Sequence, residues 1–385
     1  MIYLDNAAST PVHEKVIEEM IPYFKEQYGN PSSIHRFGRI ANAAVQTGRK
    51  RIADLINADG KDILLTSGGT ESNNTAIYGI ALQNKGRHII TSSIEHDAVL
   101  EPCKRLEREG YRVTYLPVDK FGHVNTQDIK KEISNDTCLI TIMFANNEVG
   151  TIQPIKEIAT ISHDNNVVFH TDAIQAVGKI LIDVKDLGVD LLSISSHKIN
   201  GPKGVGALYI RKGITISPLI SGGGQESGLR SGTENVASIA GFGMACKLAK
   251  ENMNQNITHF KNLTSNLINR VLNEIPGSTL NGDVEKRILN NVHFTFLGVN
   301  GEDLIIKLDE NKIAASTGSA CSVRTQKASH VLKAMGFSHE QITGSLRLSV
   351  GITNNEQEIN ETVEILKKIV QELRAVSPYK SKYNF

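Results

Sequence analysis

The chain has 385 residues, of which 40% are hydrophobic and 22% are charged, as in an ordinary globular protein. Its 42 lysines and arginines nearly balance its 41 aspartates and glutamates, so a net charge of +1 excludes a bulk electrostatic attraction to nucleic acid or an anionic membrane. The N-terminus carries no basic segment followed by an apolar one, and no apolar run approaches the roughly 18 residues of a spanning helix. We therefore expect a cytoplasmic protein without nucleic-acid or membrane partners, and the length favours two domains.

Four cysteines are widely scattered along the chain, at Cys103, Cys138, Cys246 and Cys321. Their spacing fits neither a disulfide framework nor a CxxC metal pair, so we expect reduced thiols. The first three lie in apolar or helix-like stretches and are interpreted as small core residues. Cys321 lies among small residues and is the thiol best placed to be reactive.

Short apolar runs alternate with helix-like stretches between Lys61 and Ile210. The runs are Ile63–Thr66, His88–Thr91, Val113–Leu116, Cys138–Phe144, Val167–His170, Leu191–Ser195 and Gly206–Ile210. The stretches 71–83, 98–109, 127–133 and 155–163 carry apolar residues at helical spacing. This alternation predicts an α/β layer structure with a largely parallel sheet, whose ligands gather at the carboxyl ends of the strands.

The rhythm of the chain changes after the glycine-rich segment 221–224. A helix-like stretch runs from about Asn235 toward Arg270, and the pattern then predicts strands at 291–296 and 346–350 and helices at 302–308, 328–334 and 356–373. These short elements indicate a smaller α+β domain. We expect a large domain over residues 14–253 and a small domain formed by residues 1–13 with 254–385.

One lysine, Lys198, stands just beyond a predicted buried strand. The apolar run 190–194 leads into Ser195-Ser196-His197-Lys198, and Gly201 and Pro202 then prevent further helix or strand. Such a lysine is either an ordinary loop residue or a nucleophilic amine, because partial desolvation lowers the pKa of a lysine and frees its lone pair.

Polar residues also follow the other predicted strands. Gly69 and Thr70 open a helix whose N-terminus suits a phosphate, although a capped helix start without the P-loop lysine is the plainer alternative. His96 could be a metal ligand, a base, an aromatic plate or a structural histidine. Asp172 could hold a protonated heterocyclic nitrogen, with Gln175 one helical turn further on. A metal site from His96, His170 and Asp172 is conceivable, but their spacing specifies no metal.

Two further candidates depend on local geometry. Asn147 lies in the turn-like segment 146–150 after the fourth strand, where Asn and Gly also favour a plain turn. Arg347 lies on an alternating strand, so its side chain faces away from the side taken by Leu346 and Leu348. It could take a carboxylate bidentately in a crevice, or it could be a surface arginine.

These motifs, in this order, resemble the cysteine desulfurases of the NifS/IscS type, within the class V aminotransferase family of pyridoxal-phosphate enzymes. The matching segments are 3–8, 28–33, 222–226, 230–233 and 318–321, so the resemblance covers essentially the whole chain. It implies fold type I of the pyridoxal-phosphate-dependent transferases. In that fold, a large domain has a mainly parallel seven-stranded sheet flanked by helices, and a smaller α+β domain carries the catalytic cysteine loop.

The resemblance also implies a role for each candidate residue. Lys198 would form a Schiff base with pyridoxal 5'-phosphate, and Asp172 would pair with the pyridinium nitrogen. Contacts to the ring face, ring oxygen and phosphate would come from His96, Asn147, Gln175, Gly69, Thr70, Ser195, His197 and Thr233. Thr233 would reach the neighbouring subunit of a homodimer with shared active sites. Arg347, with Asn147, would bind L-cysteine.

The implied reaction removes sulfur from L-cysteine. The Lys198 amine would take the Cα proton, and the Cys321 thiolate would then attack the substrate sulfur, giving L-alanine and a persulfide on Cys321, with His96 as acid or base. The sulfur would pass to an iron–sulfur scaffold protein or to enzymes that thiolate tRNA or cofactors. No metal is expected, apart from a cluster that Cys321 holds transiently.

One departure from the family and several alternatives remain open. Relatives commonly carry a Leu-Glu-Pro run after the cysteine, whereas this chain has Ser322 to Ala328, which leaves the choice of sulfur acceptor open. A selenocysteine lyase or a class V aminotransferase would share the fold, but transamination has no use for a thiol at Cys321. A non-catalytic scaffold would not need the complete set of candidate residues, and a metal hydrolase is the remaining alternative.

Overall fold

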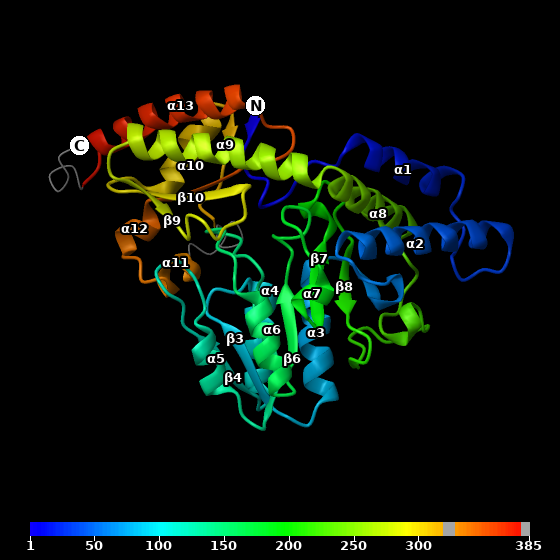
Figure 1. Cartoon of the computed structure of the whole chain (residues 1–385). Coiled ribbons are helices and arrows are strands. Elements are labelled where there is room, and N and C mark those ends of the chain that lie inside the picture. Colours follow the sequence, from blue (N-terminus) through cyan, green and yellow to red (C-terminus); the bar gives the residue numbers. More distant parts are fainter. Residues whose placement is uncertain (319–327, 379–385) are drawn as a thin grey trace.

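The computed structural model describes residues 1–318 and 328–378, and its largest element is a seven-stranded sheet (Figure 1). The strand order is β2-β8-β7-β6-β5-β3-β4. The strands are β2 (Ile63–Thr66), β3 (His88–Ser92), β4 (Arg112–Leu116), β5 (Thr137–Thr141), β6 (Val168–Asp172), β7 (Leu191–Ser195) and β8 (Gly206–Ile210). Strand β8 is antiparallel to both neighbours and the other adjacent pairs are parallel, which confirms the predicted mainly parallel sheet.

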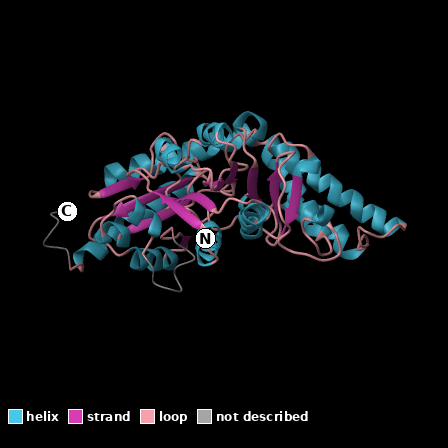
Figure 2. Cartoon of the chain, turned by 90° about the horizontal axis from the view of Figure 1, so that it is seen from below, coloured by secondary structure: helices cyan, strands magenta, loops and turns pink. Residues whose placement is uncertain are grey.

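Both faces of this sheet are buried because alternate side chains enter different hydrophobic clusters. Leu64, Ile89, Leu139 and Leu191 pack with α3 (Gly69–Gln83) and α4 (Asp97–Arg108). Their neighbours Leu65, Ile90, Ile140 and Leu192 pack with α2 (Arg36–Leu55), α6 (Ile155–Asp164) and α8 (Val236–Glu251). Figure 2 shows helices on both sides of the strands. Burial on two faces explains why the strands appear in the sequence as continuous apolar runs.

The N-terminal residues pack with the last third of the chain. Strand β1 (Ile2–Tyr3) pairs with β11 (Ile313–Ala314), and the N-terminus lies near α9 and α13 in Figure 1. A three-stranded antiparallel sheet, β12-β10-β9, forms the centre of this part. Its elements are α9 (Met253–Glu274), β9 (Ser278–Asn281), β10 (Asn291–Phe296), α10 (Gly301–Glu310), α11 (His330–Ala334), α12 (His339–Thr343), β12 (Ser345–Ser349) and α13 (Glu356–Ala375). This arrangement of short strands and helices has the α+β character predicted for it.

Several elements differ from the sequence prediction. The expected helix from Asn235 to Arg270 is two helices, because the Asn252 side chain donates to the Leu248 carbonyl at 2.9 Å and ends α8 there. The fourth predicted strand ends at Thr141 rather than Phe144, because the Met143 N–H donates to the Glu95 carboxylate. The pattern also missed α1 (Glu14–Lys25), α2 and the short α7 (Val184–Leu187), whereas it predicted α5 (Thr126–Glu132) to within one residue at each end.

Three of the four cysteines lie in the described residues. Cys103, Cys138 and Cys246 are buried free thiols, which confirms their interpretation as core residues. Cys321 and the departure at Ser322–Lys327 lie outside the described residues. No helix in the described ranges 1–318 and 328–378 is long and apolar enough to cross a membrane.

The sheet brings the carboxyl ends of six strands to one edge. Strands β3, β4, β5, β6 and β7 run in one direction, and β2 shares that direction because it and β7 are both antiparallel to β8. The segments that follow these strands contain most of the candidate residues. A common edge therefore gathers side chains that lie far apart in the sequence.

Helices α2 and α8 touch through two glycines, and this contact gives a stability prediction. A Cβ atom at Gly48 would lie 2.6 Å from the Ile239 carbonyl oxygen, and one at Gly243 would lie 2.5 Å from the Gly48 Cα. We expect Gly48→Val to lower the free energy of unfolding by about 1–3 kcal/mol, because the helices must separate. Urea unfolding checks this, with the exposed neighbour Thr47→Val as the control. Equal losses in the two variants would contradict the packing argument.

Candidate active site

Lys198 lies in the 3-10 turn η2 (Ser196–Lys198) that directly follows β7. Its amine donates to the backbone carbonyls of Ala7 at 2.5 Å and Ala8 at 2.8 Å. The N-terminal segment is held across this strand end, because the Thr10 N–H donates to the His197 carbonyl at 2.9 Å. Sequence analysis did not identify Ala7 and Ala8 as site residues, since they act through backbone carbonyls that carry no side-chain signal.

Asp172 ends β6 and is only 6% exposed. Its carboxylate accepts from the Ile174 N–H at 3.0 Å and from the Asn73 amide at 2.7 Å. Burial raises the pKa of Asp172, and the two hydrogen bonds and the neighbouring His96 and Lys198 oppose that rise. Asn73 lies in α3, one helical turn after Gly69 and Thr70, and its role was missed because an Asn near a helix start is commonplace.

His96 is the N-cap of α4, where its Nδ1 atom accepts from the Ala98 N–H at 3.0 Å. Because this bond engages only the Nδ1 atom of His96, its Nε2 atom is available to other groups. The preceding Glu95 is fully buried and accepts from the Ser92 hydroxyl at 2.6 Å and the Met143 N–H at 2.9 Å. Burial raises the pKa of Glu95 to about 8. Glu95, another residue that the sequence did not reveal, thereby fixes the segment carrying His96 to the segment that follows β5.

The N-terminus of α3 lies against the end of β7. A Cβ atom at Gly69 would lie 2.1 Å from the Ile174 Cδ1 atom and 3.5 Å from the Ser195 Cβ atom, so the close approach requires glycine. The neighbouring Thr70 is exposed, which leaves its hydroxyl accessible. Burial and then the nearby Lys198 lower the pKa of His197 to about 4, so this imidazole is neutral at pH 7. Unpaired N–H groups at such a helix start can bind a phosphate.

Arg347 reaches the same region from β12 and is 2% exposed. Its guanidinium pairs with the Asp5 carboxylate at 2.9 Å and donates to the carbonyls of Asn147 at 2.9 Å and Gly318 at 3.2 Å. Its Nε atom is buried without a hydrogen-bond partner among the described residues. The alternation argument placed Arg347 on the inward side, whereas the surface alternative is wrong and Asp5 was not foreseen.

Not all candidate residues are brought into this cluster. Gln175 joins it through a 3.0 Å bond from its amide to the Ala7 carbonyl. Thr233 is exposed between the turn η3 (Glu226–Gly228) and α8, apart from the hydrogen bonds that join the other candidates in the described part of the chain. Cys321 lies outside the described residues.

His170 is not available for the metal site that was considered from the sequence. Its ring nitrogens bond the hydroxyls of Thr141 at 2.8 Å and Ser193 at 2.9 Å inside the sheet, and burial lowers its pKa to about 3. Within residues 1–318 and 328–378, no group of three or more His, Cys, Asp and Glu side chains could hold a metal ion.

The arrangement fits a planar heterocycle with a basic ring nitrogen and a phosphate. The Asp172 carboxylate can hold a protonated ring nitrogen, and the α3 N-terminus can hold a phosphate. An amine at Lys198 and an imidazole at His96 complete a set of groups that suits carbonyl and proton chemistry. This chemistry is the one that the resemblance to pyridoxal-phosphate enzymes implies.

Comparison with known proteins gives matches over nearly the whole chain. The family model described as aminotransferase class-V matches residues 2–361. The chain is 50% identical over 384 residues to "Cysteine desulfurase IscS" of Dictyoglomus turgidum, covering 99% of this chain and 98% of that protein. It is 51% identical over 379 residues to the protein of the same name from Methanosarcina thermophila, covering 98% and 94% of the two chains.

Solved structures are similar over comparable lengths. A structure described as a NifS-like protein superposes with a TM-score of 0.91 at 38% identity, covering 96% of this chain and 99% of the other. One described as "SspA in complex with cysteine" has a TM-score of 0.81 at 37% identity, covering 91% and 99%.

The buried carboxylate gives a pH-dependent prediction. Folding raises the pKa of Asp172, so the cofactor-free protein loses stability as pH rises from the unfolded value of about 3.9 through the folded value. We expect Asp172→Asn to stabilise the cofactor-free protein at pH 7 and not at pH 4. The Asn73 amide can flip to match, because its Oδ1 atom is buried without a partner in the described part of the chain.

Urea unfolding at the two pH values checks the prediction for Asp172. The control is Asp183→Asn, since that carboxyl is partly exposed at the N-cap of α7 and its pKa is lowered by hydrogen bonds. The control is expected to lose stability at pH 7 instead of gaining it. A loss of stability in Asp172→Asn at pH 7 would contradict the argument.

Proposed function

This chain belongs to the class V aminotransferase family and, within it, to the pyridoxal-phosphate-dependent cysteine desulfurases of the NifS/IscS type, and from this membership we propose that it transfers the sulfur of L-cysteine through a persulfide on Cys321. The observation that best supports the proposal is the convergence of Lys198, Asp172 and His96 at one edge of the sheet. These three residues lie far apart along the chain, so chance is an unconvincing explanation for their common position.

The proposed cofactor site uses the groups described above. When bound, pyridoxal phosphate supplies an electron sink for the substrate carbon that loses its proton. Lys198 would hold the cofactor through its amine, Asp172 would face the ring nitrogen and His96 would cover the ring. Contacts to the ring oxygen would come from Gln175 and Asn147, and contacts to the phosphate would come from Gly69, Thr70, Ser195, His197 and Thr233 of a partner subunit. The buried Asp172 and the α3 N-terminus support these assignments.

Lys198 also serves as the base in this proposal. Its amine takes the Cα proton of L-cysteine and becomes an ammonium group. The carbonyls of Ala7 and Ala8 lie within hydrogen-bond distance of its Nζ atom, so they can stabilise that charge. His96 can exchange a proton through the Nε2 atom that its N-cap bond leaves available.

Arg347 is the proposed anchor for the substrate carboxylate. Asp5 already holds an anionic oxygen against its NH2 group, which supports this position as one that accepts a carboxylate. The neighbouring Nε atom is buried and has no hydrogen-bond partner within the described chain. A substrate carboxylate that displaces Asp5 can therefore bind the NH2 and Nε groups side by side.

Cys321 is the proposed sulfur acceptor within the protein. Its thiolate forms a bond to the substrate sulfur, the electrons of the broken carbon–sulfur bond stay with the substrate, and a proton completes L-alanine. The persulfide then passes to an acceptor such as an iron–sulfur scaffold protein, for cluster assembly or thiolation. We propose that this occurs in the cytoplasm, since the described cysteines are free thiols as in a reducing compartment.

We propose the domain division 14–253 and 1–13 with 254–385. One hydrophobic cluster joins Ile2 and Leu4 to apolar residues between Phe260 and Val370. The clusters on the two faces of the large sheet are separate from it. The helix break at Asn252 lies beside the proposed boundary.

An apolar face on α1 supports a homodimer. Ile17, Ile21 and Phe24 recur at helical spacing on α1 and are 42–66% exposed, and Tyr28 and Ile34 in the following connection are 71% and 92% exposed. The opposite face of α1 is buried against α8. An unpartnered apolar face of this kind fits a second copy of the chain, which would also supply Thr233 to the neighbouring site.

The first functional test concerns the thiol. We expect the purified protein to show the visible band of bound pyridoxal phosphate and to release sulfide and alanine from L-cysteine. Cys321→Ser is expected to keep the band and lose at least about 100-fold in sulfide release, because the nucleophile is gone. The matched control Cys246→Ala removes a buried thiol and is expected to retain the rate per folded protein. Undiminished sulfide release by Cys321→Ser would refute the persulfide, and keto-acid formation would favour an aminotransferase.

A second test addresses the dimer. Phe24→Asp places a charge on the α1 face, so we expect a shift toward monomer in sedimentation velocity and a parallel loss of sulfide release. Leu181→Asp is the control, because Leu181 is 74% exposed and lies outside that face. A Phe24→Asp protein with unchanged mass would place the interface elsewhere.

A further inference from the structure

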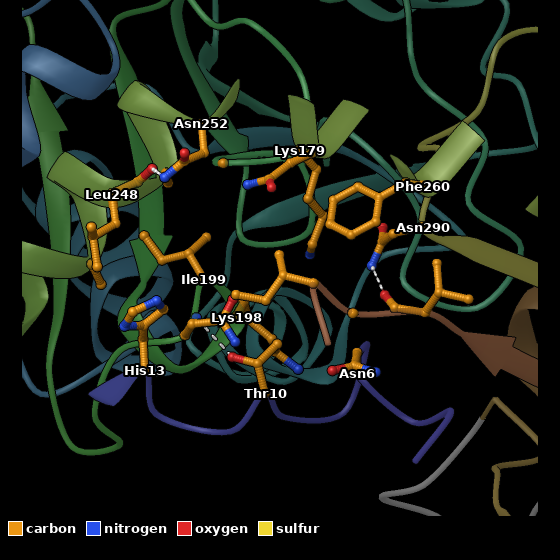
Figure 3. Close-up of a pocket in the computed structure, with 18 of the residues that line it drawn as sticks. Asn6, Thr10, His13, Lys179, Lys198, Ile199, Leu248, Asn252, Phe260 and Asn290 are labelled. Atoms are coloured by element: carbon orange, nitrogen blue, oxygen red, sulfur yellow. Dashed lines mark hydrogen bonds between the residues drawn. The ribbon is translucent and has the colours of Figure 1, made fainter. Parts of the chain in front are cut away.

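Lys179 is a buried lysine for which the proposed reaction has no use. It lies in the connection between β6 and α7 and is only 4% exposed. Its side chain borders a cavity of about 260 Å³ between the α8–α9 junction and the N-terminal segment. Figure 3 shows Lys179 in the wall of this cavity together with Lys198, Asn290 and Phe260.

The contacts of Lys179 lead toward the site. Its amine donates to the Gln175 backbone carbonyl at 3.0 Å and to the Gln175 side-chain oxygen at 3.3 Å. The Gln175 side-chain nitrogen donates to the Ala7 carbonyl, which also accepts from Lys198. A continuous set of hydrogen bonds therefore joins Lys179 to Lys198 through Gln175 and Ala7.

These partners fix the orientation of the Gln175 amide. The Ala7 carbonyl only accepts, so it must face the amide nitrogen, and the Lys179 amine, which donates in its ammonium form, then faces the amide oxygen. A flipped amide would place its NH2 group against Lys179 and its oxygen against the Ala7 carbonyl. In the observed orientation, the second N–H of Gln175 remains available to a bound molecule.

We propose that Lys179 is a positioning residue that holds the Gln175 amide with its N–H group toward the ring oxygen of bound pyridoxal phosphate. The inference rests on the proposed function, because the contact between Gln175 and the ring oxygen is part of it. Lys179 itself touches neither cofactor nor substrate and acts through Gln175.

The electrostatic environment of Lys179 argues against a role in which its side chain only fills space. Burial, and then the charges of Lys198 and Arg347, lower the pKa of Lys179 to about 7. A buried amine of this kind destabilises the fold unless its hydrogen bonds compensate, and an apolar side chain would fill the same space without that cost. Among residues 1–318 and 328–378, the amine forms hydrogen bonds with Gln175 alone, so Gln175 is the group that its position serves.

The test uses the full-length protein loaded with pyridoxal phosphate. Lys179→Met keeps the length of the side chain and removes the donor, so we expect about tenfold weaker cofactor binding. The pH at which the visible band titrates should rise, because a negative ring oxygen that loses its donor holds a proton more tightly. Lys179→Gln can still donate and is expected to recover part of both effects. Lys130→Met, an exposed lysine on α5, is the control and should change neither.

A double variant separates positioning from a merely structural role. If Lys179 acts through Gln175, adding Lys179→Met to Gln175→Ala should weaken binding no further. Additive losses, or an unchanged affinity and titration in Lys179→Met, would overturn the inference. If Lys179→Met does not fold, Lys179→Gln takes its place in the cycle. These readouts need only the visible band, so a wild-type protein that binds the cofactor without releasing sulfide would refute the proposed function alone.

Discussion

The site depends on the N-terminal segment that crosses the carboxyl edge of the large sheet. Asp5 pairs with Arg347, the Ala7 carbonyl accepts from both Lys198 and Gln175, and Thr10 bonds the backbone of His197. The sheet alone would present these side chains at an open edge. The crossing segment fixes the amine and the guanidinium relative to each other, although one comes from η2 and the other from β12.

This arrangement concentrates buried ionisable groups at one place. Burial raises the pKa of Asp172 and of Glu95 and lowers that of Lys179. The charged form of each group is therefore less stable in the folded protein than in water. A cationic ring nitrogen at Asp172 would relieve part of that strain, since an opposite charge favours the carboxylate. The folded protein thus carries an electrostatic cost that its cofactor is suited to offset, and cofactor binding should accordingly stabilise the fold.

The sequence predicted the sheet and its edge because both follow from local patterns. Continuous apolar runs predicted the strands. Parallel strands bring their carboxyl ends together, so Asp172 and Lys198 could be expected at the same edge of the sheet. Asn73 and Asp5 could not be predicted in the same way, since their importance lies in a tertiary partner rather than in spacing. Ala7 and Ala8 offer only carbonyls, and the break at Asn252 depends on one side chain competing with the helix backbone.

The two ends of the segment that carries Cys321 are both fixed to the site. At one end, the Gly318 carbonyl accepts from Arg347, the proposed anchor of the substrate. At the other end, the Ser329 hydroxyl bonds the buried Glu148 at 2.5 Å, and the His330 ring bonds the Glu95 carbonyl beside His96 at 2.9 Å. Gly318 and Ser329, which flank this segment on its two sides, therefore lie next to groups that would hold the substrate. In the proposed function, Lys198 removes the proton and Cys321 takes the sulfur, and the contacts of Gly318, Ser329 and His330 support this division of roles.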